Sequence, residues 1–255
     1  MTAARKKKKR RLIPVLLFSL LIGLLLFAGW VYWAMQYSSV YYKAFGIRIP
    51  EGFKVHGIDV SRYQKRINWN DVAEMNINGI SFEFCFIKAT QGTGRKDPYF
   101  NRNWERSKNA GLIRGAYHYF EPAQDGYKQA NFFLSQVDHE AGDLPPVLDI
   151  EEINGVSKST LRKRLKDWLK KVENSTGVQP IIYTNPKTYY YLLDDDFSHY
   201  PLWIAHYHGG GRPRIFRNWH FWQHSESGRV NGIRGNVDFN VFSGDKTELR
   251  KLLIP

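Results

Sequence analysis

The stretch PPVLDIE, residues 145–151, is the most informative segment of the sequence for predicting the fold. It begins with a short apolar run of the kind found in buried strands, and two carboxylates, Asp149 and Glu151, close it. In a strand, residues i and i+2 point to the same face and lie about 6.5 Å apart along the backbone. The two carboxyl groups can therefore converge on one point at the end of a strand.

Seven further strand-like stretches accompany it, and helical patterns lie between the early ones. The eight candidate strands are VHGIDVS (55–61), ISFEFCFIKAT (80–90), IRGAYHYF (113–120), PPVLDIE (145–151), PIIYTN (180–185), LWIAHY (202–207), HFWQHS (220–225) and VDFNVF (237–242). The candidate helices are Trp69–Met75, Tyr99–Ala110, Gln124–Val137 and Ser157–Ser175. The last helix is the clearest, because Leu161, Leu165 and Trp168 follow the spacing of one apolar face.

Strands that alternate with helices indicate a parallel sheet. Eight strands in about 200 residues fit a barrel, but no long helix separates the last three, and a complete (β/α)8 barrel usually needs about 250 residues. We therefore expect an α/β fold, a modified TIM-like (β/α) barrel with eight strands and a helix-poor C-terminal part.

The N-terminus has a composition of its own. Residues 5–11 (RKKKKRR) are all basic, and residues 12–35 carry no charge. Because about 20 apolar residues let a helix cross a bilayer, this run predicts one transmembrane helix through the lipid bilayer. Lysine and arginine stay on the cytoplasmic side, so the N-terminus should be cytoplasmic and the rest periplasmic or extracellular. A cleaved signal peptide is the competing interpretation, although its apolar region is normally shorter, about 7–15 residues.

These segments divide the chain into four parts. We expect a basic cytoplasmic tail (1–11), a transmembrane signal-anchor (12–35), a juxtamembrane spacer (36–53) and a barrel domain (54–255). The single cysteine, Cys85, excludes an intrachain disulfide, and its apolar surroundings predict a buried small hydrophobe.

The net charge of +13 has a different meaning once the tail is set aside. The tail holds seven of the 37 basic residues, which leaves 30 basic and 24 acidic residues in the remainder. A mildly basic exterior suits an anionic wall polymer or a membrane surface. No basic stripe interleaved with aromatic residues is present, and export argues against nucleic acid, so nucleic-acid binding is excluded.

Four acidic residues lie at strand ends, where barrels of this kind gather their active sites. Asp59 lies late in the first strand, Asp149 and Glu151 close the fourth, and Asp238 lies in the last. Like charges in a partly dry pocket push one pKa upward, so that one group stays protonated while another is ionised. Cleavage of a glycosidic bond needs that division. An Asp-x-Glu pair alone is often a helix cap or an ion pair, and it is the joint occurrence of four acids that favours a site.

Aromatic residues near the same strand ends are the second indication. Sugars present apolar C–H faces on which aromatic rings stack, while polar groups fix their orientation. Core packing is the alternative for each ring taken singly. The acidic and histidine residues show no arrangement with the spacing of metal ligands, so we expect no metal.

The motifs together resemble glycoside hydrolase family 25, the Chalaropsis-type muramidases. They are HGIDVSRYQ (56–64), FIKATQG (86–92), RGAYHYF (114–120), PVLDIE (146–151), IIYTN (181–185), LWIAHY (202–207) and VDFN (237–240). The resemblance spans residues 54–243 in the correct order. It implies a peptidoglycan hydrolase, a lysozyme that cleaves the β-1,4 bond between N-acetylmuramic acid and N-acetylglucosamine in glycan strands, without metal or organic cofactor.

The resemblance also implies roles for single residues. Glu151 would be the general acid/base, and Asp149 would orient the 2-acetamido group of the substrate in a net-retaining reaction. Asp59 and Asp238 would complete the catalytic acids. Expected substrate contacts are Tyr117, Tyr119, Tyr183, Trp203 and Gln223. Two alternatives stay open: a non-catalytic, membrane-tethered peptidoglycan-binding protein on the same barrel, and a membrane-tethered assembly protein.

Overall fold

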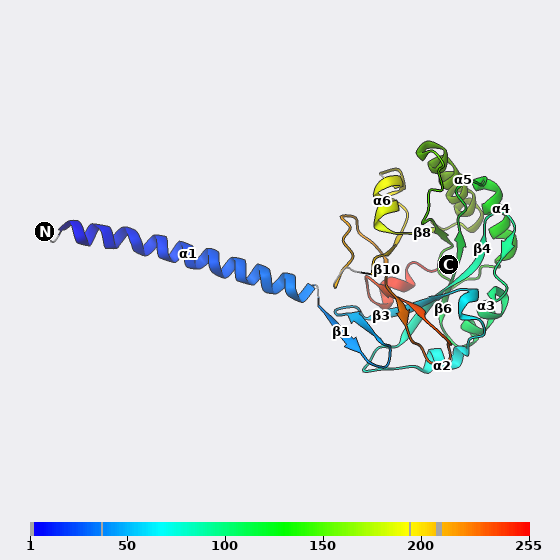
Figure 1. Cartoon of the computed structure of the whole chain (residues 1–255), viewed down its shortest axis with the longest axis horizontal. Coiled ribbons are helices and arrows are strands. Elements are labelled where there is room, and N and C mark those ends of the chain that lie inside the picture. Colours follow the sequence, from blue (N-terminus) through cyan, green and yellow to red (C-terminus); the bar gives the residue numbers. More distant parts are fainter. Residues whose placement is uncertain (1–2, 37, 194, 208–210) are drawn as a thin grey trace.

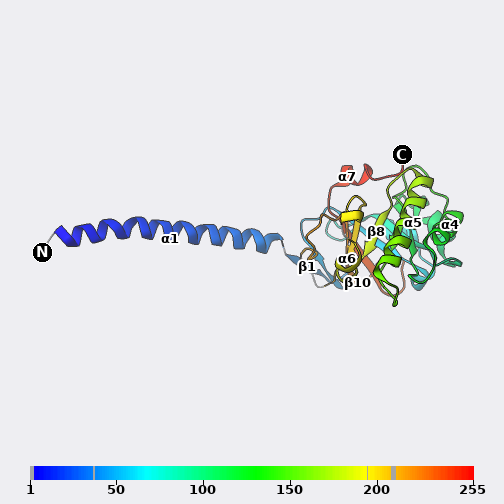
Figure 2. The same cartoon turned by 90° about the horizontal axis from the view of Figure 1, so that it is seen from above.

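The computed structural model of the chain describes residues 3–36, 38–193, 195–207 and 211–255, shown in Figure 1. Met1 and Thr2 of the expected basic tail and Tyr37 of the expected spacer lie outside the described residues. A single long helix, α1 (Ala3–Gln36), stands away from a compact domain, as Figure 2 shows from above. Residues Pro14–Tyr32 of α1 are apolar and long enough to cross a membrane, and none of this span is buried. An anchor and a signal sequence both fit this helix.

Eight strands close into a barrel. Their bounds are β3 (Val55–Val60), β4 (Phe82–Gln91), β6 (Ile113–Tyr119), β7 (Val147–Asp149), β8 (Ile181–Thr184), β9 (Leu202–Ala205), β10 (Phe221–Gly228) and β11 (Val237–Phe242). The order around the barrel is β3-β11-β10-β9-β8-β7-β6-β4, and β4 pairs with β3 to complete the ring. The short β5 (Arg95–Lys96) adds to the edge of β4. The eight predicted strands and the barrel are confirmed.

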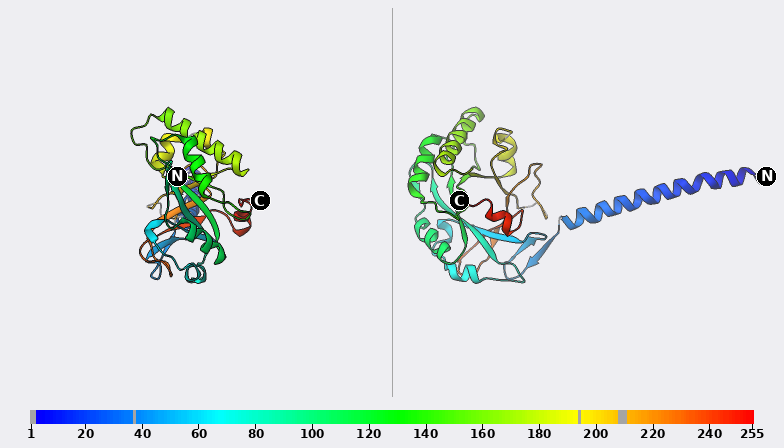
Figure 3. Two further views of the ribbon diagram at one scale, coloured as in Figure 1. Left: turned by 90° about the vertical axis from the view of Figure 1, so that its right-hand side faces the viewer. Right: turned by 180° about the vertical axis from the view of Figure 1, so that it is seen from behind.

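Helices cover the outside of the parallel half of the barrel (Figures 1 and 3). They are α2 (Trp69–Glu74), α3 (Phe100–Asn109), α4 (Gly126–Gln136), α5 (Lys158–Thr176) and α6 (Pro186–Leu192), with 3-10 turns at Arg62–Gln64 and Asp195–Phe197. The last helix, α7 (Lys246–Arg250), follows β11 and lies within the outline of the barrel in Figure 1. The sequence of α5 defines both of its ends. Ser157 accepts a hydrogen bond from the Thr160 N–H, and Gly177 takes a left-handed conformation at the C-terminus.

The C-terminal part departs from a regular barrel in strand direction. Strands β3, β4, β6, β7, β8, β9 and β10 run parallel to one another, but β11 is antiparallel to both β10 and β3. Among the described residues, no helix separates β9, β10 and β11, as the helix-poor prediction requires. The antiparallel register sets Asp238 directly opposite Asp59.

The segment expected as a spacer contains folded structure. Strands β1 (Ser39–Tyr42) and β2 (Ile47–Pro50) form an antiparallel hairpin. Its turn places Phe45 in the core, with ring centroids 5.3 Å from Phe239 and 6.1 Å from Phe82. The folded part of the chain therefore begins before Lys54, the boundary expected from the sequence, because the apolar hairpin residues bury themselves against the barrel.

Aromatic side chains pack against one another within the domain. Phe86 stacks on Trp203 at 4.3 Å, and Phe84 meets Phe86 edge to face at 5.6 Å. Glycines on neighbouring strands make room for these rings, because a Cβ at Gly57 would lie 2.4 Å from Phe84 and one at Gly115 would lie 2.7 Å from Phe86. The strands can therefore enclose large rings without voids.

We predict that Gly126→Ala destabilises the domain. A Cβ at Gly126 would lie 1.9 Å from the backbone carbonyl oxygen of Arg164, so α4 and α5 would have to separate. Such overpacking costs about 1–3 kcal/mol. In thermal unfolding of the full chain in detergent, each kcal/mol should lower the Tm by roughly 2–4 °C.

Gly94→Ala is the matched control, because a Cβ at Gly94 would meet no atom within 4 Å and the φ of this glycine is not positive. It should change the free energy of unfolding by no more than about 0.5 kcal/mol. Equal Tm values for Gly126→Ala and Gly94→Ala would contradict the close helix packing.

Candidate active site

A small pocket opens at the end of the barrel where the parallel strands finish. Its volume is about 260 Å³, and all nine residues expected from the sequence line it. They are Asp59, Asp149, Glu151, Asp238, Tyr117, Tyr119, Tyr183, Trp203 and Gln223. These residues lie on β3, β6, β7, β8, β9, β10 and β11 or just beyond a strand end, so barrel closure alone brings them together.

The backbone that carries Asp149 and Glu151 is held by hydrogen bonds to β8 and to α6, the helix that follows it. The Ile150 N–H donates to the carbonyl of Tyr183 at 3.0 Å, and the Ile150 carbonyl accepts from the Thr184 hydroxyl at 2.7 Å. The Glu151 carbonyl accepts from the Thr188 hydroxyl at 2.8 Å. The direction in which the two carboxyl groups point is therefore fixed by the fold.

Asp149 and Glu151 form a hydrogen-bonded carboxyl pair. Asp149 is only 5% exposed, whereas Glu151 is half-buried and faces the pocket. Burial raises the pKa of Asp149 well above its usual value, and the nearby Glu151 charge adds to this rise. Burial also raises the pKa of Glu151, assisted by the charge of Asp59. The pair therefore keeps a proton to a higher pH than isolated carboxyl groups do.

Asp59 and Asp238 form a second pair across the β3–β11 register. Asp59 Oδ2 accepts hydrogen bonds from Gln223 Nε2 and Asn240 Nδ2, both at 2.7 Å. Burial raises the pKa of Asp59, and the amide donors offset part of this rise, so that the pKa is about 6. Burial, the Asp59 charge and a hydrogen bond to Asp59 raise the pKa of Asp238 to about 9. At neutral pH Asp238 is therefore protonated and Asp59 is largely ionised.

Hydroxyl and indole groups orient these amides. Tyr183 and Tyr207 both donate to Gln223 Oε1, at 2.8 and 2.7 Å, and Trp203 Nε1 donates to Asn240 Oδ1 at 2.8 Å. Each amide is then left with its nitrogen directed at Asp59. Since Tyr183 and Trp203 are only 6% and 2% exposed, they form the floor of the pocket and offer little surface for stacking.

The pocket also contains residues outside the predicted set. Ser61, Tyr63, Lys88, Tyr207 and Glu226 line it. Lys88 lies 4.4 Å from the centroid of the Tyr119 ring and donates to Gln91 Oε1 at 3.0 Å. Burial lowers its pKa, while the charges of Asp149 and Asp97 oppose this. A lysine that interrupts the apolar run FEFCFIKAT was the signal in the sequence.

The described residues contain no group of three or more histidine, cysteine or acidic side chains able to hold a metal ion. The pocket holds two carboxyl pairs with raised pKa, surrounded by tyrosine hydroxyls. This chemistry suits proton transfer to and from an oxygen atom bound in the pocket.

The sequence is similar to those of several known proteins. The family described as Glycosyl hydrolases family 25 matches residues 58–233. The chain is 52% identical over 208 residues to the uncharacterized protein YegX of Escherichia coli (strain K12), covering 82% of this chain and 76% of that protein. It is 36% identical to Lysozyme M1 of Streptomyces globisporus, covering 78% and 71%.

Solved structures agree with the fold. A bacterial lysozyme from Streptomyces coelicolor superposes with a TM-score of 0.72 at 35% identity, covering 79% of this chain and 98% of that one. A family 25 glycosyl hydrolase from Bacillus anthracis gives a TM-score of 0.73 at 29% identity, covering 79% and 94%.

We predict that Asp238→Asn alters how stability depends on pH. The pKa of Asp238 is about 9 in the folded chain, and an aspartate in an unfolded chain has a pKa of about 3.9. Between these values only the folded state keeps the proton, so the free energy of unfolding falls as the pH rises through this window. Asparagine cannot ionise, so the Tm of the variant should fall less than that of the parent between about pH 5 and pH 8, which lies within the range between the two pKa values.

Glu105→Gln, which removes an exposed carboxyl on α3, is the control and should follow the parent. Parallel Tm curves for the parent and Asp238→Asn across this range would show that Asp238 does not hold a proton at neutral pH.

Proposed function

The chain belongs to glycosyl hydrolases family 25, and we propose that it is a peptidoglycan hydrolase, an N-acetylmuramidase. It would cleave the β-1,4 bond between N-acetylmuramic acid and N-acetylglucosamine. The observation that carries this proposal is the hydrogen-bonded carboxyl pair of Asp149 and Glu151 in the pocket, in which burial raises the pKa of both groups. Its lysozyme relatives support the same substrate class.

Glu151 is suited to be the general acid/base. It is the more exposed member of the pair, so its proton can reach a glycosidic oxygen bound in the pocket. Proton transfer to that oxygen lets the bond to C1 of the muramic acid residue break. The resulting carboxylate can then take a proton from the water that attacks C1.

Asp149 is suited to hold the 2-acetamido group. Its Oδ1 is buried and accepts no hydrogen bond from the described residues, so an amide N–H of the substrate can donate to it. When the shared proton lies on Glu151, the Asp149 carboxylate stabilises positive charge on the acetamido group as its carbonyl oxygen attacks C1. Water then opens this intermediate from the face that the leaving group occupied, which gives net retention.

Asp59 and Asp238 would complete the site from the opposite wall of the pocket. The Asp59 carboxylate places negative charge near the oxocarbenium-like centre, and Asp238 and the two amides hold Asp59 in position. Tyr117 and Tyr119 are half-buried in the pocket and are the rings best placed to contact sugar.

We also propose that α1 anchors the chain in a membrane, with the N-terminus cytoplasmic and the barrel on the other side. The apolar span Pro14–Tyr32 is unburied, and the basic residues precede it. Hydrolysis would then be limited to wall within reach of the bilayer, with peptidoglycan glycan strands as the partner.

Glu151→Gln should remove most of the hydrolytic activity. A positioned general acid contributes about 10²- to 10⁴-fold to rate, and glutamine has no proton to transfer. The full chain in detergent would be incubated with purified peptidoglycan, and new ends identified by mass spectrometry after borohydride reduction. We expect reduced muramic acid ends from the parent and very few from the variant.

Glu152→Gln is the matched control, because Glu152 is the adjacent residue but is exposed and does not line the pocket. It should retain the parent rate. Equal rates for parent and Glu151→Gln would refute the assignment of the acid. Retained binding without new ends from the parent, over several wall types, would favour a non-catalytic binding protein.

The anchor proposal predicts that the mature protein keeps its N-terminus. Intact mass of the chain purified from membranes should correspond to all residues from the basic tail onward, and alkaline carbonate should not extract it. A mature chain that begins after residue 32 would show that α1 is a cleaved signal sequence.

A further inference from the structure

Two segments of the domain beside the end of α1 are rich in basic residues. Residues 47–54 and 211–219 carry Arg48, Lys54, Arg212, Arg214 and Arg217 against one acid, Glu51. Together the two segments carry a net charge of +4, and α5 (Lys158–Thr176) is the other strongly basic segment of the domain.

Exposed apolar side chains gather on the same side. Outside α1, eight large hydrophobic side chains of the described residues are exposed; besides Tyr63, Tyr127 and Tyr207 they are Val40, Tyr41, Tyr190, Tyr191 and Phe216. The last five lie on β1, on α6 and in the segment before β10, which Figures 1 and 3 show on the side of the barrel nearest α1. The ring of Phe216 is 100% exposed, which is unusual for a phenylalanine in water.

The chain cannot move this side far from the bilayer. Six residues, and so seven Cα–Cα steps, separate the apolar span, which ends at Tyr32, from Ser39 at the start of β1. Even fully extended they reach no more than about 25 Å. Ser39 pairs with Pro50 in the hairpin, and Phe53 follows shortly after, so the segment 47–54 is held close to the membrane surface.

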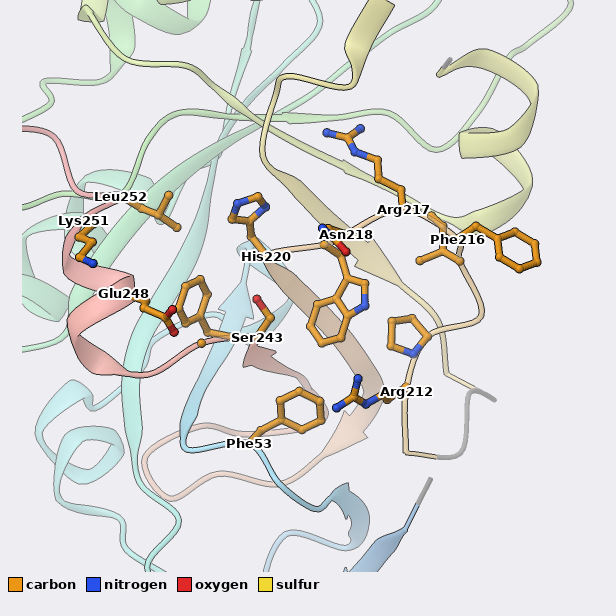
Figure 4. Close-up of a pocket in the computed structure, with 15 residues that line it drawn as sticks. Phe53, Arg212, Phe216, Arg217, Asn218, His220, Ser243, Glu248, Lys251 and Leu252 are labelled. Atoms are coloured by element: carbon orange, nitrogen blue, oxygen red, sulfur yellow. The ribbon is translucent and has the colours of Figure 1, made fainter. Parts of the chain in front are cut away.

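Residues 211–219 are fastened to this tethered region. Phe53 packs against Trp219 with ring centroids 5.8 Å apart, and both line a cavity of about 770 Å³ shown in Figure 4. Arg217 donates to the carbonyl oxygens of Ser198 and Tyr200, which fixes the middle of the segment. In Figure 4 the ring of Phe216 points away from this cavity.

Unlike Arg217, Arg212 and Arg214 do not hold the segment in place. Neither makes a hydrogen bond or an ion pair with any residue that the structure describes, and both are exposed. Two unpaired arginines beside a fully exposed phenylalanine give a surface that combines positive charge with an apolar side chain. Such a combination matches the headgroup region of a bilayer with anionic lipid.

We propose that Arg48, Lys54, Arg212, Arg214 and Phe216 form a juxtamembrane patch that docks on anionic phospholipid headgroups. The proposal rests on α1 as a membrane anchor. The patch would hold the barrel in one orientation, since the cavity of Figure 4 and the acidic pocket lie at opposite ends of the same strands. Phe53 lines the cavity and precedes β3, whereas Asp59 lines the acidic pocket and lies near the end of β3. In the same way His220 lines the cavity and precedes β10, whereas Gln223 lines the acidic pocket and lies within β10. Docking therefore directs the acidic pocket away from the membrane.

The test uses the full chain in lipid nanodiscs, with a fluorophore on Asn218→Cys. Cys85 is fully buried, so the introduced thiol is labelled selectively. Lipids with a quencher on the headgroup report contact. We expect stronger quenching in discs with anionic lipid than in zwitterionic discs, and weak quenching of a label on Lys170→Cys on α5. Each basic residue beside an anionic surface strengthens attraction by roughly fivefold.

Arg212→Gln with Arg214→Gln should therefore weaken docking by roughly 25-fold, and adding Phe216→Ser should weaken it further. Arg95→Gln with Arg106→Gln removes the same charge from exposed sites elsewhere and should leave quenching unchanged. None of these residues lines the acidic pocket, so hydrolysis of soluble glycan fragments should stay at the parent rate.

Quenching at position 218 that is no stronger than at 170, or that ignores lipid charge, would overturn the proposal. So would protection of the label by purified peptidoglycan but not by lipid. Carbonate extraction tests the anchor separately, because extraction of the chain from membranes would refute anchoring. In that case, quenching of the label by added anionic vesicles would still show whether the patch binds lipid. Absence of hydrolysis in every variant would refute the muramidase proposal alone.

Discussion

Four carboxyl groups share one small pocket at the end of the barrel, and too little water reaches them for all four to ionise. Burial raises the pKa of each, and the charges of neighbours raise it further for Asp149, Glu151 and Asp238. Protons are therefore held within two carboxyl pairs at a pH where isolated carboxyl groups would have lost them. A half-buried glutamic acid beside a buried aspartate is the state that general acid catalysis requires.

Two features of the fold maintain this unfavourable grouping of charge. Reversal of β11 sets Asp238 against Asp59 and brings Asn240, from the same strand, within 2.7 Å of the Asp59 carboxylate. Large aromatic rings beneath the pocket then hold the amides in one orientation through hydroxyl and indole donors. Because the amide nitrogens of Gln223 and Asn240 donate to Asp59, they stabilise its charge, and the proton of this pair stays on Asp238.

Much of this could be predicted from the sequence, for identifiable reasons. Eight apolar runs with helical patterns between them are long-range regularities, and acids at strand ends converge as soon as a barrel closes. Asn240 could not be found in this way, because its role depends on the antiparallel register of β11. The hairpin at residues 39–50 was missed because its strands are only four residues long and follow a transmembrane pattern. The juxtamembrane patch joins two segments far apart in sequence.

Carbon-13 NMR titration of the aspartate and glutamate carboxyl groups tests proton sharing in the pocket most directly. Comparison of the parent with Asp149→Asn, Glu151→Gln and Asp238→Asn would assign the resonances. We predict protonated carboxyl signals at neutral pH that disappear in these variants and titrate above the usual range of about 3.9–4.3. If every carboxyl group of the parent titrated within that range, the pocket would hold four separate charges and the proposed acid would have no proton to give.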